Sequence, residues 1–165
     1  MKKTAPKTRK APSGGVLSLF TIGYEQAKPA AVLGELTQAK IDTLVDVRAV
    51  AASRRPGFSK RQLAAALDEN GIAYLHLQKL GTPAEGRQAA RAGDRDTLWR
   101  IYEKHIKKAE PQAELGELAD LVKSGKRIAI LCYCRDPKIC HRWIICTHLE
   151  NRLPLRVEDL IPPLF

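Results

Sequence analysis

The residues of this 165-residue sequence that are best suited to chemistry are gathered in one short stretch. All four cysteines and two of the four histidines lie there, in a pattern that begins Cys132-x-Cys134-x5-Cys140-His141-Arg142. A thiolate is a nucleophile and a metal ligand, an imidazole moves protons near neutral pH, and a guanidinium binds anions. Thiol catalysis, metal binding, redox chemistry and anion binding are therefore the activities to weigh.

The sequence around these residues predicts a strand, a turn and the start of a helix. Ile128–Cys132 is a short apolar run, typical of a strand that is buried on both faces. The turn that follows contains Pro137, which has no backbone N–H to donate. Apolar residues then recur at helical spacing, so we expect a helix from near Cys140 to Asn151. The free amides and positive dipole end of that helix would favour an anion or a thiolate at the turn.

Two interpretations of Cys140 stay open. A helix N-terminus with His141 and Arg142 beside it predicts a pKa below the usual value of about 8.5, and hence a reactive thiol. The alternative is an inert thiol, because free cysteines are commonly buried. The Cys-x5-Arg loop of phosphatases is disfavoured, since the residue at the arginine position after Cys132 or Cys134 is not an arginine.

The three thiols and the imidazole are also potential metal ligands. Zinc sites usually pair their ligands two to four residues apart at both ends of the motif, and that spacing is missing here. We therefore predict neither a metal nor another cofactor. Cys134 and Cys140 are a candidate redox pair, and Cys146, inside the helix, is expected to be part of the core.

Further polar residues follow the strands that we expect at Val16–Ile22 and Ile41–Val47. Asp46 and Arg48 point the same way if the strand continues, and they form either a ligand site or a structural ion pair. The long loop after this strand is of the kind that holds ligands in α/β proteins, although it is also compatible with a solvated surface loop. The candidate anion-binding residues are Thr21, Gly23, Tyr24, Arg48, Ser53, Arg54 and Arg142.

The remaining patterns alternate helices with strands. Helices are expected at residues 28–39, 60–69, 94–108 and 111–123, and further strands at 72–77 and 155–157. Residues 84–93 show no clear period and are expected to form a mobile excursion or lid. The alternation predicts a single α/β domain over residues 16–165, with a mostly parallel central sheet of about four to five strands and helices on both faces, in Rossmann-like layers.

In such a sheet the carboxyl ends of the first, second and fourth strands meet at one edge, which would bring the candidate residues together. We expect Cys140, His141 and Asp46 to be the catalytic residues there. In this hypothesis Asp46 orients His141 or acts as a base.

The positive charge is concentrated at the N-terminus. The formal net charge is +10, from 28 basic and 18 acidic residues, and the first ten residues contain five basic residues and no acidic one. We expect residues 1–15 to be a disordered tail that either binds polyanions or plays no part. No apolar run approaches the roughly 20 residues of a membrane span, so we expect no membrane partner and a cytoplasmic location.

Five blocks of the sequence resemble the DUF488 family, bacterial and archaeal proteins grouped without an agreed function. The blocks are Thr21-Ile22-Gly23-Tyr24, Asp46-Val47-Arg48 with Ser53-Arg54 and Phe58, Gly71-Ile72-x-Tyr74-x-His76 with Gly81, Leu131-Cys132, and Asp136-Pro137-x2-Cys140-His141-Arg142. The resemblance covers about residues 19–150. It implies a compact α/β domain with its shared polar residues at one site, but no particular reaction. Cys134 departs from the pattern, which is expected to have an acidic residue there.

The main hypothesis is a small enzyme that acts on a phosphate-bearing substrate, either a nucleotide or a nucleic acid. One alternative is a non-enzymatic nucleic-acid-binding module whose basic tail and arginine loop contact backbone phosphates. Another is a thiol redox sensor. The sequence does not decide whether the protein is an enzyme, and it predicts no oligomeric state.

Overall fold

The computed structural model describes residues 15–164, which contain one parallel β-sheet. Its strands are β1 (Leu17–Gly23), β2 (Thr43–Asp46), β3 (Ala73–His76), β4 (Ile128–Cys132) and β5 (Leu155–Leu160). They are ordered β3-β2-β4-β1-β5, and every pair of neighbours is parallel. The central strand β4 therefore lies between β1 and β2, and all five strands end at the same edge.

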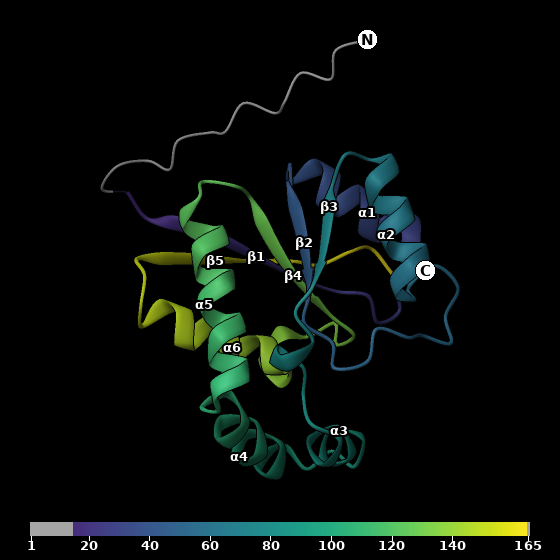
Figure 1. The fold of residues 1–165 in the computed structure, drawn as a ribbon. Coiled ribbons are helices and arrows are strands. Elements are labelled where there is room, and N and C mark those ends of the chain that lie inside the picture. Colours follow the sequence, from purple (N-terminus) through teal and green to yellow (C-terminus); the bar gives the residue numbers. More distant parts are fainter. Residues whose placement is uncertain (1–14, 165) are drawn as a thin grey trace.

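Helices cover both faces of this sheet (Figure 1). The helices are α1 (Pro29–Gln38), α2 (Lys60–Glu69), α3 (Ala84–Arg91), α4 (Arg95–Ile106), α5 (Ala109–Lys123) and α6 (His141–Glu150), with single 3₁₀ turns at Gln78–Leu80 and Pro137–Ile139. Helices α1 and α2 pack on one face, whereas α4, α5 and α6 contribute to the core on the other. The predicted single α/β domain with helices on both faces is confirmed, and the sheet has five strands, all parallel.

Strand β4 shows how the alternation of a strand distributes its side chains. Ala129 and Leu131 point into the core beneath α1 and α2, whereas Ile130 and Cys132 point into the core beneath α4–α6. Every residue of this strand is buried, as expected for a central parallel strand with helices on both faces. The alternation places Cys132 on the face that α6 covers.

Residues 84–93 differ from the sequence-based expectation, because most of them form helix α3. Gly86 and Ala89 are buried, and a Cβ added to Gly86 would lie 2.6 Å from Cγ2 of Thr82. These small residues let α3 pack closely against the rest of the domain. Such packing depends on tertiary contacts, so it cannot be seen in the spacing of hydrophobic residues along the sequence. The last strand is also longer than expected, because it pairs with β1 along its whole length.

Two further expectations concern the basic N-terminal segment and the lack of a membrane span. Apart from Gly15, the basic segment 1–15 lies outside the described residues. Within residues 15–164, no helix combines the length and apolar character that crossing a membrane requires.

Candidate functional site

Cys140 lies where the turn after β4 becomes helix α6. Pro137–Ile139 forms a 3₁₀ turn, in which the side chain of Asp136 accepts a hydrogen bond from the amide of Lys138. Cys140 is the N-cap of α6, and its Sγ accepts from the amide of Arg142 over 3.5 Å. The sulfur therefore lies at the positive end of the helix dipole, where negative charge is stabilised.

His141 is held between this sulfur and the end of β2. Its Nε2 lies 2.8 Å from the carbonyl oxygen of Val47, and its Nδ1 lies 3.5 Å from Sγ of Cys140. A carbonyl oxygen only accepts hydrogen bonds, so Nε2 carries a proton. Nδ1 is then the nitrogen that can take the proton of the Cys140 thiol.

The charges of these two residues support each other. Burial disfavours the thiolate, but hydrogen bonds from Cys132 and Cys134 and the nearby His141 hold the pKa of Cys140 well below its usual value. Burial likewise lowers the pKa of His141, but the adjacent Cys140 thiolate outweighs it and raises that pKa. The arrangement therefore favours a thiolate and an imidazolium side by side.

The other two thiols of the site remain protonated. Sγ of Cys132 lies 2.6 Å from Sγ of Cys140, and burial raises the pKa of Cys132 well above its usual value. The hydrogen bond with Cys132 lowers the pKa of Cys134, but hydrogen bonding to Cys140 and burial raise it overall, to about 12. These pKa shifts favour Cys132 and Cys134 as hydrogen-bond donors and Cys140 as the thiol that carries the negative charge.

Arg142 stabilises the turn from behind. Its side chain is 1% exposed and donates to Oγ1 of Thr21 over 3.2 Å and to the carbonyl oxygen of Cys134. The hydroxyl of Thr21 in turn donates to Asp159 on β5. Gly23 allows this close packing, since a Cβ there would lie 1.8 Å from the Cys134 oxygen.

Asp46 and Arg48 form a buried ion pair on the other face of the sheet. The closest contact, from Nη2 of Arg48 to Oδ2 of Asp46, is 2.7 Å. Arg48 also donates to the hydroxyl of Tyr24 and to the carbonyl oxygen of Phe58, whereas Asp46 accepts from the hydroxyl of Tyr74 over 2.6 Å. The pair has the geometry of the structural ion pair that the sequence left as an alternative.

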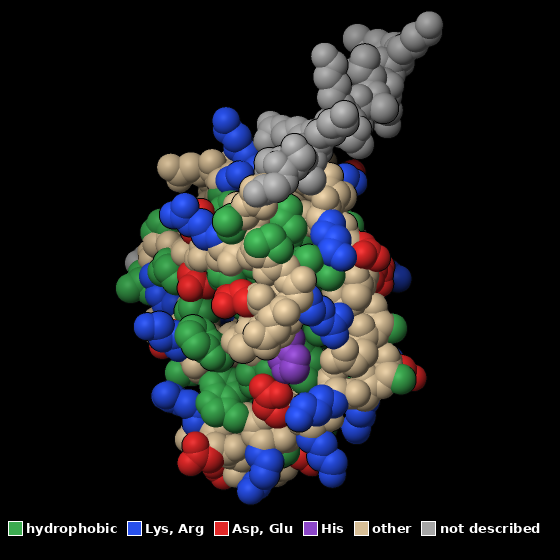
Figure 2. Space-filling model, turned by 90° about the vertical axis from the view of Figure 1, so that its left-hand side faces the viewer, with side chains coloured by type: hydrophobic (Ala, Val, Ile, Leu, Met, Phe, Trp, Pro, Cys, Tyr) green, Lys and Arg blue, Asp and Glu red, His purple; other side chains and the backbone are tan. Residues whose placement is uncertain are grey.

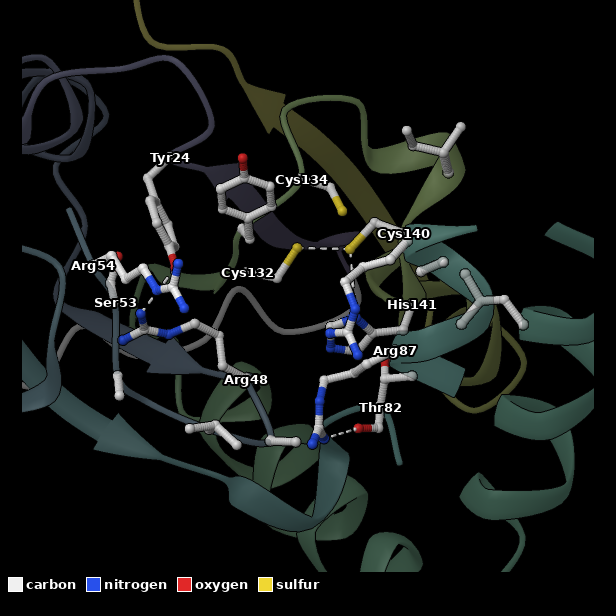
Figure 3. A pocket seen from close by; sticks show the side chains of 18 residues that line it. Tyr24, Arg48, Ser53, Arg54, Thr82, Arg87, Cys132, Cys134, Cys140 and His141 are labelled. Carbon is white, nitrogen blue, oxygen red and sulfur yellow. Dashed lines mark hydrogen bonds between the residues drawn. The ribbon is translucent and has the colours of Figure 1, made fainter. Parts of the chain in front are cut away.

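A cavity of about 420 Å³ opens between Arg48 of this ion pair and the thiols with His141. Figure 3 shows the thiols and His141 along one side of it, with Arg48 and Arg54 on the opposite side. Arg87 and Arg91 of α3 also line it, and Arg87 donates to the carbonyl oxygen of Thr82 over 2.8 Å. The cavity is thus lined both by Cys140 and by several guanidinium groups.

Six of the ten residues expected at the site line this cavity. They are Tyr24, Arg48, Ser53, Arg54, Cys140 and His141. Asp46 lies behind Arg48, and its hydrogen-bond partners are Arg48 and Tyr74, whereas His141 bonds to Val47 and Cys140. Thr21 and Arg142 line a separate hollow of about 210 Å³ between α6 and β5, and Gly23 packs against the turn after β4.

Sequence reasoning missed the contribution of α3. Arg87 and Arg91 are four residues apart and therefore lie on one face of that helix. This i,i+4 pair was the available signal, but it has meaning only once residues 84–93 are known to be helical.

Three side chains of the cluster could also hold a metal ion. One donor atom each from Cys132, Cys140 and His141 lie within 4.8 Å of one another. Sulfur and imidazole nitrogen are the ligands that zinc prefers, and the Val47 carbonyl would fix the ring of His141. The fold therefore gathers ligands whose spacing in the sequence gave no zinc motif.

Comparison with known proteins gives a family but no activity. The model of a domain of unknown function, DUF488, matches residues 28–149 of the 165-residue chain. A search of curated proteins returned no match. The matched segment contains Asp46, Cys140 and His141 and excludes strands β1 and β5.

Proposed function

The chain belongs to the DUF488 family, and we propose that it is a small enzyme whose Cys140 thiolate attacks a phosphate-bearing substrate, such as a nucleotide, bound in the cavity beside it. The observation that carries the proposal is the position of His141. Its Nε2 is fixed by the Val47 carbonyl, and its Nδ1 faces Cys140 at the wall of the cavity. A thiol with a base oriented by a third group is the usual arrangement of an activated nucleophile.

In the proposed reaction His141 moves one proton. Transfer of the Cys140 proton to Nδ1 of His141 gives the thiolate and the imidazolium. Sγ then forms a bond to an electrophilic atom of the substrate as the bond to the leaving group breaks. The imidazolium returns its proton to that leaving group, and water or a second acceptor later releases the product from Sγ.

The arginines of the cavity would hold the phosphate. Arg54 lines the cavity from a loop, and Arg87 and Arg91 line it from α3. A guanidinium group can donate two parallel hydrogen bonds to two oxygens of one phosphate. Arg142 has a different part in this proposal. It is buried against Thr21 and the Cys134 carbonyl and positions the turn that carries the thiols.

The test compares two alkylating reagents of similar size and opposite demands on charge. Iodoacetate is an anion and iodoacetamide is neutral, so their rate ratio at Cys140 reports the positive field of the cavity. We expect iodoacetate to be favoured in the native protein and Arg87→Ala to reduce that preference by about three- to tenfold. Arg61→Ala removes the same charge from the exposed side of α2, outside the cavity, and is the matched control.

Substrate protection completes the test. Inorganic phosphate and adenosine monophosphate should slow alkylation of Cys140 in the native protein, and less so in Arg87→Ala. A Cys140 that reacts no faster than a free thiol at pH 7 would overturn the proposed nucleophile. Fast alkylation with no preference for iodoacetate and no protection would overturn the anionic substrate.

The nucleic-acid-binding alternative has less support among the described residues. On the face drawn in Figure 2, Lys and Arg side chains are interspersed with Asp and Glu and form no continuous basic stripe. A duplex-binding surface normally concentrates its positive charge on one face. Binding to a DNA duplex that falls steeply with salt and needs residues 1–12, but is unaffected by His141→Gln, would favour this alternative over a pocket enzyme.

A further inference from the structure

From the contact between two sulfur atoms we infer that Cys132 and Cys140 form a reversible disulfide when the protein meets a peroxide, and that this bond switches off the nucleophile. The inference that the bond is a switch rests on the proposed function, whereas formation of the bond does not. The two sulfurs lie 2.6 Å apart, although the residues are eight positions apart in the sequence.

The fold already brings the two residues into position for the bond. Cys132 is the last residue of β4, and Cys140 caps α6 on the same face of the sheet. The turn between them is fixed at both sides, by the Arg142 contact with the Cys134 carbonyl and by the amide of Glu25, which donates to the carbonyl oxygen of Tyr133 over 2.9 Å. A disulfide needs side chains that face each other at short range, and the two sulfurs already do.

A small oxidant has a route to the pair. Both cysteines are only 2% exposed, but both line the cavity of about 420 Å³ that opens beside them. Hydrogen peroxide is of similar size to water and can enter such a cavity. The interior of the protein would exclude larger oxidants from Cys132.

The chemistry balances with one peroxide per bond. The Cys140 thiolate attacks one peroxide oxygen, and the O–O bond breaks to give Cys140 sulfenic acid and hydroxide, which takes up a proton. The Cys132 thiol then attacks the oxidised sulfur, and the new S–S bond forms as water leaves. Two electrons pass from the two sulfurs to the peroxide, and a dithiol reductant reverses the change.

Cys132 is a better partner than Cys134, which the sequence had suggested. Cys132 is buried beside Cys140 at the end of a central strand, whereas Cys134 is partly exposed and lies in the turn itself. The third thiol is thus left free in the oxidised protein. This difference gives the experiment its control.

The experiment treats reduced, chelator-washed full-length protein with an excess of hydrogen peroxide over protein and maps the cysteines by mass spectrometry. Trypsin separates Cys140, in peptide 139–142, from Cys132 and Cys134, in peptide 128–135. We expect these two peptides to become linked, with Cys146 unchanged. The link should persist in Cys134→Ser and disappear in Cys132→Ser. In that variant a second peroxide oxidises the Cys140 sulfenic acid to the sulfinic acid, which dithiothreitol does not reduce.

The functional readout is alkylation of Cys140 by iodoacetamide. We expect it to fall by about tenfold or more after peroxide and to recover fully with dithiothreitol. In Cys132→Ser the loss should not be recovered by dithiothreitol. Recovery in that variant would overturn the inference.

Other outcomes are equally decisive. A link that survives Cys132→Ser and is lost in Cys134→Ser assigns the pair to Cys134 and overturns the inference. So does stoichiometric zinc that resists the chelator and protects the thiols from peroxide, because the cluster would then be a metal site. If the disulfide forms but reduced Cys140 alkylates no faster than a free thiol, the proposed enzyme fails and the bond stands without a catalytic role.

Discussion

Nε2 of His141 lies 2.8 Å from the carbonyl oxygen of Val47, which joins the start of α6 to the end of β2. The two residues are far apart in sequence and meet because β2 and β4 are neighbours in the sheet. Because the carbonyl oxygen accepts a hydrogen bond from Nε2, the neutral imidazole carries its proton on Nε2. Its unprotonated Nδ1 then faces Cys140. In the proposed enzyme this main-chain oxygen orients His141, one of the two roles that the sequence suggested for Asp46.

The first prediction concerns the dependence of Cys140 on His141. His141→Gln removes the imidazolium beside a buried thiol, so the pKa of Cys140 should rise. Alkylation by iodoacetamide at pH 6 should therefore fall by about tenfold or more, with a smaller difference at pH 9. His148→Gln is the control, because His148 lies on the same helix but pairs with Glu103 outside the cavity.

The second prediction is the pH range of the proposed reaction. The pKa of Cys140 is lowered and that of His141 is raised, so thiolate and imidazolium coexist between the two values. As pH falls through the Cys140 pKa the thiolate is protonated, and alkylation and turnover should both fall. As pH rises through the His141 pKa the imidazolium is lost, so turnover should fall while alkylation stays high. Turnover that follows alkylation at high pH would show that His141 donates no proton to the leaving group.

The third prediction concerns the buried pair of Asp46 and Arg48. Asp46→Asn leaves the guanidinium of Arg48 buried without its counter-charge, so the free energy of unfolding should fall by about 3 to 5 kcal/mol. Tyr74→Phe removes only the phenol hydroxyl that donates to Asp46, and should cost about 1 to 2 kcal/mol. Urea unfolding followed by circular dichroism measures both. Equal small losses would place the ion pair among contacts that contribute little.

The fold was predictable because short-range sequence patterns identify most of its strands and helices. Buried runs such as Ile128–Cys132 alternate with helices whose start residues, for example Pro29 and Lys60, agree with the predicted starts to within one residue. Helix α3 was not predictable in this way. Its buried residues are Gly86 and Ala89, which carry little hydrophobic signal and owe their burial to contact with the rest of the domain.

The site was predictable as a location but not in its contacts. Strand ends of a parallel sheet share one edge, which is why Tyr24, Arg54 and Cys140 line one cavity. Alternation along each strand then separates the side chains between the faces. Asp46 points toward the α1 and α2 side of the sheet, whereas His141 lies on the other side. The hypothesis placed them together because both follow strands that end at the same edge, but it did not take account of the face on which each side chain lies.

The fourth prediction tests the close packing of Gly23 against the turn that follows β4 and contains Cys134. A Cβ at this position would lie 1.8 Å from the carbonyl oxygen of Cys134, so Gly23→Ala must displace the turn. We expect a loss of stability of about 1 to 3 kcal/mol, as for other overpacked sites, and slower alkylation of Cys140. Gly34→Ala on α1 is the matched control, because its Cβ would meet nothing within 4 Å. That variant should be stabilised by up to about 1 kcal/mol, since alanine favours helix.

The fifth prediction separates support of the turn from catalysis. Thr21→Val keeps the shape of the side chain but removes the hydroxyl that donates to Asp159 and accepts from Arg142. Two buried or part-buried groups then each lose a partner, so the free energy of unfolding should fall by about 1 to 3 kcal/mol. Because Thr21 lies outside the cavity, the pKa of Cys140 measured by alkylation should stay unchanged. A raised Cys140 pKa in this variant would show that Thr21, acting through Arg142, helps to set the charge of the nucleophile, and would extend the site across the sheet to β5.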